Sequence, residues 1–300
     1  MTLMDIRVED GYPTRIQGEP ELLERHDPTV WGSAADGPID SATLAGHDAR
    51  GYSNVENLLS RVEVEAYWND LIRLTGRPQL RGDERVITEP KSDEVRSIFD
   101  VHLLSDLVGE LVRDPRVLDR ARQILGSEVY IHQSRVNYMP GFEGTGFYWH
   151  SDFETWHAED GMPAPRAVSC SIALTDNFAF NGGLMVIPGS HRTFVQCAGG
   201  TPRNNYKRSL KAQRAGVPSQ DNVSKMAAEH GIEQFTGAAG DALFFDSNVL
   251  HGSGNNITPY MRSNIFLVFN SVENPLGQPF SAAEPRPTFI AGRDFTPLTR

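Results

Sequence analysis

The sequence has few cysteines, no long apolar run and no excess of basic residues. With two cysteines in 300 residues, it does not indicate a disulfide framework. No stretch approaches the length and apolarity of a membrane span. The formal net charge is -11 at pH 7, which argues against a general affinity for nucleic acid or for an anionic membrane surface. We therefore expect neither nucleic acid nor a membrane among the partners of this protein.

The first residues and the two cysteines bear on the compartment. Met1–Gly11 carries three acidic side chains and lacks the apolar core of a secretory signal. One disulfide between Cys170 and Cys197 is possible by number, but Cys170 lies in a strand-like run where a small apolar residue fits. These features favour a cytoplasmic protein.

The composition is that of an ordinary globular protein. Hydrophobic residues make up 39% of the chain and charged residues 22%. A chain of this length can bury a sizeable core. We find no internal repeat, low-complexity tract or convincing linker. After an irregular N-terminal segment at residues 1–55, which is rich in Gly, Pro and Asp, we expect a single domain at residues 56–300.

The first part of that domain, residues 56–127, shows helical signals. Ser60–Glu63 has the pattern of a capping box and precedes apolar residues at helical spacing. Asp93–Arg113 has the apolar spacing of one amphipathic helix or a pair of them. Asp114–Pro115 forms an N-cap with proline at the first helical position, and Gly126 ends that helix. The pattern predicts a helical flank.

Beyond Gly126 the apolar period changes towards two, which is typical of strands. Several short strands without alternating helices favour a sandwich or a jelly-roll barrel, here at residues 128–275, followed by a C-terminal segment at 276–300. The fold class is thus mainly β with flanking helices. The expected strands are Val129–Met139, Ala167–Thr175, Leu184–Ile187, Ala242–Phe245 and Ile265–Phe269.

A long polar insert, residues 193–231, interrupts these strands. It has two interpretations. The simpler one is a solvated helix with loops. The other is a lid over the mouth of the barrel, because long insertions in compact domains are often functional. Its basic side chains are Arg203, Lys207, Arg208, Lys211 and Arg214.

The most informative stretch is 147–166, FYWHSDFETWHAEDGMPAPR, which contains a His-x-Asp triplet at His150 and Asp152. On a strand, side chains at i and i+2 leave the same face, so an imidazole and a carboxylate would converge. His251 is the best candidate for a third ligand. Two histidines and one carboxylate form the facial triad of non-heme iron(II) oxygenases, which leaves metal positions open for chemistry. A lone triplet of this kind also arises by chance.

Arg262, eleven residues beyond His251, opens another strand-like run and can bind a carboxylate through two parallel hydrogen bonds. The combination of triad and arginine is more specific than its parts. A jelly-roll protein that binds metal or solute without catalysis is an alternative, but it has no need of open metal positions beside an anion site. A zinc hydrolase is another. The sequence offers no obvious separate general base for such a hydrolase, and hydrolysis would leave the role of Arg262 unexplained.

The order of His150, Asp152, the Gly240–Asp241 turn, His251 and Arg262 resembles the iron(II)- and 2-oxoglutarate-dependent oxygenases of the phytanoyl-CoA dioxygenase type. Within them, FYWHSDFETWHAEDGMP is similar to the signature of the ectoine hydroxylases. The likeness covers roughly residues 94–296 and includes the segments VYIHQSR at 129–135, IPGSHRTF at 187–194 and HGSGNNITP at 251–259.

The resemblance implies a double-stranded β-helix core, that is, a cupin-like jelly roll, with helices packed around it. It also implies hydroxylation of ectoine to 5-hydroxyectoine with iron(II), 2-oxoglutarate and O2, giving succinate and CO2. Ectoine and its product are compatible solutes made under osmotic or heat stress. By analogy the enzyme would be a homodimer. A related hydroxylase for another small amino acid or cyclic solute is the alternative within this class.

Site residues follow from the same resemblance. Iron(II) would be held by the triad, and the distal carboxylate of 2-oxoglutarate by Arg262, Ser253 and Asn137. The other interpretation of Trp156 and of Phe269 is a place in the core, and that of Arg286 is the surface. The residues implied for ectoine are Gln133, Thr155, Trp156, Ser169, Phe269 and Arg286.

Overall fold

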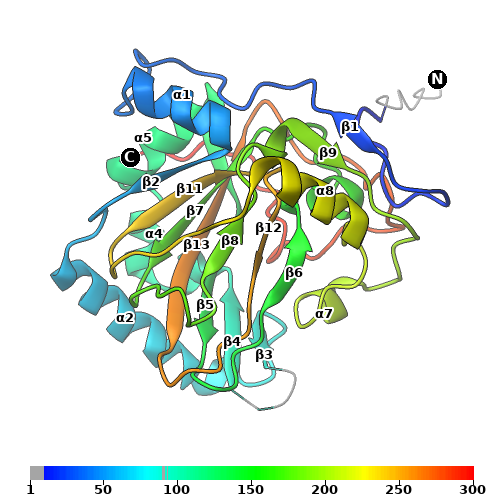
Figure 1. The fold of residues 1–300 in the computed structure, drawn as a ribbon. Helices are drawn as coiled ribbons and strands as arrows, with labels where there is room; N and C mark the ends of the chain where they lie inside the picture. The colour runs from blue at the N-terminus through cyan, green and yellow to red at the C-terminus, as the bar shows by residue number, and fades with distance from the viewer. Residues whose placement is uncertain (1–9, 90–91, 93) are drawn as a thin grey trace, which may run out of the picture.

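The computed structural model describes residues 10–89, 92 and 94–300, and it contains two antiparallel sheets that face each other (Figure 1). Most of Met1–Gly11, where we expected no secretory signal, lies outside these residues. In the part of the chain that is described, no helix combines the length and apolarity that a membrane crossing needs. The elements confirm a mainly β fold with flanking helices.

The larger sheet has seven strands in the order β2-β11-β7-β13-β5-β4-β3. Its central strands β7 and β13 are buried on both faces, and β13 has the continuous apolar run Ile265–Phe269 in its middle instead of an alternating pattern. The strands are β2 (Tyr52–Val55), β3 (Val86–Thr88), β4 (Val95–Phe99), β5 (Val129–Met139), β7 (Ala167–Ala173), β11 (Ala242–Asp246) and β13 (Arg262–Ser271).

The smaller sheet has four strands in the order β10-β8-β12-β6 and carries two of the three triad residues. Its strands are β6 (Phe147–His150), β8 (Leu184–Val186), β10 (Glu233–Gln234) and β12 (His251–Ser253). A separate pair joins β1 (Leu22–Glu24) to β9 (Thr193–Val195), which ties the N-terminal segment to the start of the insert.

Helices cover the outer face of the larger sheet, on the side away from the smaller sheet (Figure 1). Helix α2 begins after the Ser60 capping box, and α5 begins with Pro115 after its Asp114 cap and ends at Gly126, as the sequence predicts. The helices before the core are α1 (Ser41–Arg50), α2 (Arg61–Thr75), η1 (Pro78–Leu80), α3 (Val101–Leu104), α4 (Asp106–Leu111) and α5 (Pro115–Leu125). Later come α6 (Asp152–Thr155), η2 (Trp156–Asp160), η3 (Ser190–Arg192), α7 (Tyr206–Ser209) and α8 (Gln220–His230).

Strand β11 shows how period two builds two apolar layers. Ala242 and Phe244 belong to the cluster beneath the helices, whereas Leu243 and Phe245 belong to the cluster between the two sheets. Gly240 makes the turn into this strand with φ of +101°, and a Cβ there would lie 2.3 Å from the Leu59 carbonyl oxygen. Only glycine fits such a turn without strain.

Two parts of the fold differ from the sequence-based expectation. The amphipathic helix expected at Asp93–Arg113 begins too early, because Val95–Phe99 forms strand β4 between β3 and β5. Residues 1–55, expected to be irregular, include α1 and β2. Asp40 caps α1 at its start and Gly51 ends it, and β2 then pairs with the edge of β11. In β4 and in β2, pairing with strands distant in sequence determines the local structure.

Candidate active site

The three candidate metal ligands meet at the open edge of the smaller sheet. One ligand atom of each of His150, Asp152 and His251 lies within 4.8 Å of the other two. The Asp152 carboxylate lies between the rings, 3.7 Å from His150 Nε2 and 3.8 Å from His251 Nε2. The two histidines are direct cross-strand partners on β6 and β12. The triad thus lies together although His251 is about a hundred residues from the other two members in sequence.

The His-x-Asp triplet does not lie on one strand, as the sequence pattern suggested. His150 ends β6, Ser151 caps the next helix, and Asp152 is the first residue of α6. The carboxylate therefore reaches the histidines from a strand-to-helix corner. The convergence that we expected is present, but a turn and a helix start produce it.

Each candidate histidine has its ring nitrogens assigned by a local hydrogen bond. The Nδ1 atom of His150 is 2.7 Å from the Tyr148 carbonyl oxygen, and that of His251 is 3.0 Å from the Val249 carbonyl oxygen. A carbonyl only accepts, so each Nδ1 carries the proton and each Nε2 presents a lone pair to the site. Burial, followed by the neighbouring His251, lowers the pKa of His150 to about 4. The His150 ring is therefore neutral, as a ligand must be.

A cavity opens beside the triad and lies between the two sheets. From β5 it is lined by Gln133, Arg135, Asn137 and Met139, which alternate along the strand as residues on one face of a sheet do, and also by Tyr138 near the end of the strand. Strand β13, paired with β5, contributes further residues from the same side. The cavity is built on the two longest strands, which gives it a rigid wall.

Arg262 lines this cavity and is buried, yet it has no carboxylate partner among the described residues. Its Nη1 donates to the Asn264 amide oxygen at 3.3 Å, and its Nε has no partner. Burial, followed by repulsion from Arg96, lowers the pKa of Arg262 to about 10. A buried cation without a carboxylate partner is a receptor for an anion.

Asn137 and Ser253 line the same cavity as Arg262. The Asn137 side-chain oxygen accepts a hydrogen bond from Ser97 Oγ at 2.7 Å, and Ser253 Oγ accepts one from the Phe147 amide at 3.1 Å. These bonds hold both side chains in place. The three residues expected to bind the cosubstrate therefore share one cavity with the triad.

Arg135 was missed by the sequence analysis and is the second arginine of this cavity that lacks a carboxylate partner within the described chain. Its guanidinium lies over the Phe266 ring at 4.9 Å, and its Nε is buried without a partner. Burial lowers its pKa, and the nearby Asp152 partly offsets this. The signal was available: Arg135 is two residues before Asn137, and alternate strand residues share a face.

Three of the side chains expected to bind substrate, Gln133, Thr155 and Trp156, line the same cavity. Gln133 donates from its amide to the Ile290 carbonyl at 2.7 Å, which orients the group. Thr155 and Trp156 follow Asp152 on α6 and η2, and both line the cavity. Trp156 is nearly buried and packs its ring against His132 with centroids 4.8 Å apart. The aromatic face is therefore fixed in position.

Arg286 also lines the cavity and is buried, so it is not the surface residue of the alternative interpretation. Its Nε and Nη2 donate to the two carboxylate oxygens of Asp160 at 2.8 and 2.5 Å. This bidentate pair fixes the plane of the guanidinium and compensates its charge. The C-terminal segment thus contributes directly to the site.

Ser169 and Phe269 are not among the residues that line the cavity. Phe269 lies in the core beneath the helices, on the same face of β13 as Ile265 and Leu267. Because residues two apart share a face, the cavity side of β13 carries Arg262 and Phe266 instead. Ser169 is buried on β7 and its hydroxyl has no hydrogen-bond partner within the described chain.

A buried ion network supports the helices that follow Asp152, and nothing in the sequence marked it. Arg15 from the N-terminal segment donates to Glu154 at 2.6 Å and to Glu159 at 3.1 Å. Asn205 from the insert also donates to Glu159, at 2.7 Å. Glu154 and Glu159 bracket Thr155 and Trp156, so two distant segments hold this wall of the cavity.

The insert borders the cavity mouth. Helix α8 fits the simpler interpretation of a solvated helix with loops, whereas the end of α7 and the loop after it reach the site. The second interpretation, that residues 193–231 act as a lid over the mouth of the barrel, stays a prediction. The lining residues from the insert are Asn205, Ser209, Leu210, Gln213 and Ala215.

The donor set fits iron(II). Two neutral imidazole nitrogens and one carboxylate oxygen on one side of a metal are typical of non-heme iron(II) oxygenases and leave the cavity side free for other ligands. Both Nε2 atoms face the Asp152 carboxylate and have their Nδ1 protons engaged elsewhere. The unpaired arginines fit an anionic ligand in the same space.

Comparisons with known proteins agree with this site. The phytanoyl-CoA dioxygenase (PhyH) family matches residues 48–264. The chain is 61% identical over 289 residues to the ectoine dioxygenase of Nocardia farcinica, covering 96% of this chain and 95% of that protein. It superposes with a TM-score of 0.86 on the crystal structure of EctD from S. alaskensis with 2-oxoglutarate and 5-hydroxyectoine, at 44% identity over 95% of each chain.

The same relative has also been solved with bound iron. That structure gives a TM-score of 0.87 at 43% identity and covers 97% of this chain and 98% of the other. Identity and coverage at this level extend over the whole fold, including both segments that carry the triad. The chain therefore belongs to the phytanoyl-CoA dioxygenase family and, within it, to the ectoine dioxygenases.

Proposed function

We propose that this chain hydroxylates ectoine to 5-hydroxyectoine, using iron(II), 2-oxoglutarate and O2 and releasing succinate and CO2. One observation carries the proposal: a single cavity contains the His150, Asp152 and His251 donors, unpaired Arg262, and the aromatic face of Trp156. The S. alaskensis relative was solved with 2-oxoglutarate and 5-hydroxyectoine. Membership in the ectoine dioxygenases supports the same substrate.

The charges of the cavity suit 2-oxoglutarate. Arg96 is paired with Glu89 and Arg286 with Asp160, so Arg135 and Arg262 supply the uncompensated positive charge. A dicarboxylate would neutralise these two cations. We assign the distal carboxylate to Arg262 with Ser253 and Asn137 as hydrogen-bonding neighbours, since charge-assisted bonds to a guanidinium are strong and directional.

Iron(II), when bound by the triad, supplies the activation of O2 that couples oxidative decarboxylation of 2-oxoglutarate to hydroxylation of a C–H bond. The chain contributes the surroundings. The hydrogen bonds from Nδ1 of His150 and of His251 to the Tyr148 and Val249 carbonyls keep each Nε2 unprotonated. The buried wall of β5 and β13 limits the access of water to the metal.

Ectoine is a small zwitterion with a delocalised cationic ring and a carboxylate. We assign its ring to the fixed face of Trp156, because a cation is attracted to an aromatic face. The carboxylate is assigned to the free edge of Arg286, and Gln133 and Thr155 supply polar contacts. Ser169 and Phe269, set back from the cavity, contribute to this wall only through their neighbours.

Anaerobic reconstitution tests the proposal. The metal-free chain is loaded with iron(II), and 2-oxoglutarate, O2 and ectoine are then added while succinate and 5-hydroxyectoine are measured together. Matched formation of both products is expected. Succinate without 5-hydroxyectoine would retain the oxygenase and exclude the substrate. Absence of both products from folded, iron-loaded protein would contradict the oxygenase itself.

Three broader assignments belong to the proposal. We infer that the enzyme acts in compatible-solute metabolism under osmotic or heat stress, in the cytoplasm and as a homodimer. Their support is the relation to the ectoine dioxygenases. Light scattering of the purified chain tests the dimer, and growth of a deletion strain at high salt and high temperature tests the physiological role.

A further inference from the structure

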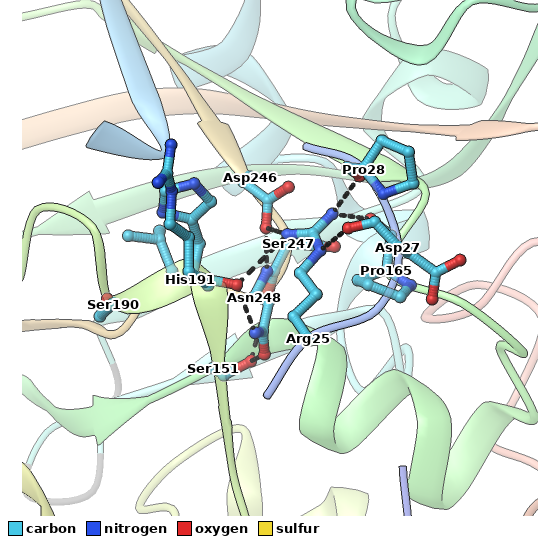
Figure 2. Close-up of polar contacts among 12 residues, drawn as sticks. Arg25, Asp27, Pro28, Ser151, Pro165, Ser190, His191, Asp246, Ser247 and Asn248 are labelled. Atoms are coloured by element: carbon cyan, nitrogen blue, oxygen red, sulfur yellow. Dashed lines mark hydrogen bonds and ion pairs between the residues drawn. The ribbon is translucent and has the colours of Figure 1, made fainter. Parts of the chain in front are cut away.

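A second buried network connects Arg25 in the N-terminal segment to Ser151, the residue between His150 and Asp152 (Figure 2). Arg25 follows β1, is almost fully buried, and does not line the cavity. Its guanidinium donates to the Asp246 carboxylate at 2.8 Å. It also donates to four backbone carbonyls, those of Asp27, Pro28, Pro165 and His191. Every N–H direction of this guanidinium is therefore used inside the protein.

Asp246 connects Arg25 to the turn that precedes His251. It is the last residue of β11 and is buried. The oxygen that accepts from Arg25 also accepts from the Asn248 amide at 2.7 Å. The Arg25–Asp246 pair thus fixes the backbone of the turn between β11 and β12.

Asn248 has a buried side chain that makes three hydrogen bonds. Its Nδ2 donates to the carbonyls of His191 at 2.8 Å and Thr193 at 3.1 Å. Its Oδ1 accepts from Ser151 Oγ at 3.0 Å. Figure 2 shows Asn248 lying between Ser151 and His191. Because both N–H donors and the acceptor oxygen are engaged, this side-chain amide can hold only one orientation.

Ser151 is the residue between two of the candidate metal ligands. Its Oγ, which donates to Asn248, accepts a hydrogen bond from the backbone N–H of Glu154 at the start of α6. This is the helix that carries Asp152. A backbone bond runs parallel to this contact, from the Phe153 amide to the Ser247 carbonyl at 2.8 Å. The Ser151–Asn248 contact therefore joins the segment of His150 and Asp152 to the segment that leads to His251.

We propose that Asn248, held by Arg25 and Asp246, is a positioning residue that sets the separation of the two ligand-bearing segments of the metal site. The inference rests on the proposed metal site. None of these three side chains touches the cavity, so their part is geometric. Replacing a buried ion pair by apolar residues is often neutral for stability, so such a pair is better explained by the register that it imposes. Groups that orient metal ligands from behind commonly tune metal affinity.

The test is metal binding by the full chain, independent of turnover. Metal-free protein is titrated anaerobically with Co²⁺, and the visible absorption of the bound ion is followed. We expect Asn248→Ala to raise the Co²⁺ dissociation constant about tenfold or more. We also expect a changed absorption band, because the ligand geometry relaxes. A parent chain that binds no Co²⁺ would refute the metal site itself, which is a different result from an unaffected variant.

Asn274→Ala is the matched control. Asn274 is also buried and makes three side-chain hydrogen bonds, to both backbone groups of Ala164 and to Asn270. None of its partners is a candidate ligand or a neighbour of one. We expect both variants to lower the midpoint of thermal unfolding and only Asn248→Ala to weaken Co²⁺ binding. Equal Co²⁺ affinities for the two variants and the parent would overturn the proposal.

Ser151→Ala provides a second and milder test if Asn248→Ala does not fold. It removes the hydroxyl that Asn248 accepts from and leaves the Arg25–Asp246 pair intact. We expect weaker Co²⁺ binding than in the parent. Where Asn248→Ala folds, adding it to Ser151→Ala should cost less Co²⁺ affinity than it costs in the parent, because the two changes share the Ser151–Asn248 contact. Full Co²⁺ affinity in Ser151→Ala, or additive losses in the double variant, would refute the assigned contact.

Discussion

Arg262 and Met139 face each other as cross-strand partners on β13 and β5, with Nη2 of the arginine 3.8 Å from the methionine sulfur. The sulfur is a weak acceptor and carries no charge. The cation therefore has no neutralising partner on the neighbouring strand. Its charge is available to a ligand in the cavity, and this is why we assign the cosubstrate carboxylate to it.

Arg262→Ala should raise the KM for 2-oxoglutarate more than the KM for ectoine. A hydrogen bond to a charged group contributes about 1.5–3 kcal/mol, so the increase should be about ten- to hundredfold. Steady-state kinetics with each substrate varied in turn measures both constants. Arg203→Ala, at an exposed position of the insert, is the control. A larger effect on ectoine than on 2-oxoglutarate would contradict the assignment.

Replacement of His150, Asp152 or His251 by Ala should abolish iron-dependent turnover and leave the barrel folded. The side chains lie at the edge of the smaller sheet rather than in an apolar cluster, so their removal leaves the core intact. Product formation and circular dichroism, measured on the same samples, test both parts of the expectation. Full activity in any of the three variants would exclude that residue as a ligand.

Trp156→Ala should impair the use of ectoine while Co²⁺ binding stays at the parent level. The ring offers its face to the cavity, whereas the triad takes no ligand from it. The KM for ectoine and the Co²⁺ dissociation constant are measured side by side. An equal loss of metal binding would instead make Trp156 a structural residue of η2.

Phe266→Ala and Phe269→Ala should separate activity from stability. Phe266 lines the cavity beneath Arg135, so its loss should lower kcat/KM by about tenfold, as expected for loss of about 1.4 kcal/mol. Phe269 fills the core beneath the helices. Its loss should lower the free energy of unfolding by about 3–5 kcal/mol and spare kcat/KM of the folded enzyme. A loss of kcat/KM in Phe269→Ala without a loss of stability would instead support a place for Phe269 in the substrate site.

The stability of the metal-free protein should fall as the pH drops below 6.5. Burial lowers the pKa of His47 from 6.5 to about 4, and burial does the same for His191. Above pH 6.5 each of these imidazoles is neutral in both the folded and the unfolded chain. Below pH 6.5 the imidazoles of the unfolded chain bind protons, whereas those of the folded chain stay neutral until about pH 4. Stability is therefore lost between 6.5 and about 4, by roughly 2 kcal/mol per histidine at about pH 5.

Urea unfolding at several pH values, with EDTA present, measures this dependence. His47→Gln should show a shallower loss of stability than the parent between neutral pH and about pH 5, because one proton fewer is taken up on unfolding. An identical pH slope in parent and variant would show that His47 does not titrate in this window.

Local patterns predicted much of the fold. The strand expected at Val129–Met139 has the same bounds as β5, and the capping residues Ser60, Asp114 and Gly126 lie where the helices α2 and α5 begin or end. These signals reside within a few residues of sequence. The division of the chain into an N-terminal segment, a helical flank and a core with an insert stays a prediction.

Long-range contacts account for what the sequence could not show. Val95–Phe99 has apolar spacing compatible with a helix, and only its pairing with β3 and β5 makes it a strand. Arg25 and Asp246 are 221 positions apart, and Arg15 and Glu154 are 139 apart. No local pattern joins such partners. Phe269 is different, since counting alternate residues from Arg262 already points to Phe266.

His150 and His251, which pair across β6 and β12, are 101 positions apart in sequence. Contacts between residues so distant in sequence cost chain entropy and commonly form late in folding. The two histidine nitrogens therefore come close enough to bind one ion only when β6 has paired with β12. A metal ion added during refolding would report that pairing, and iron supplied to a nascent chain would stay unbound until both strands have emerged.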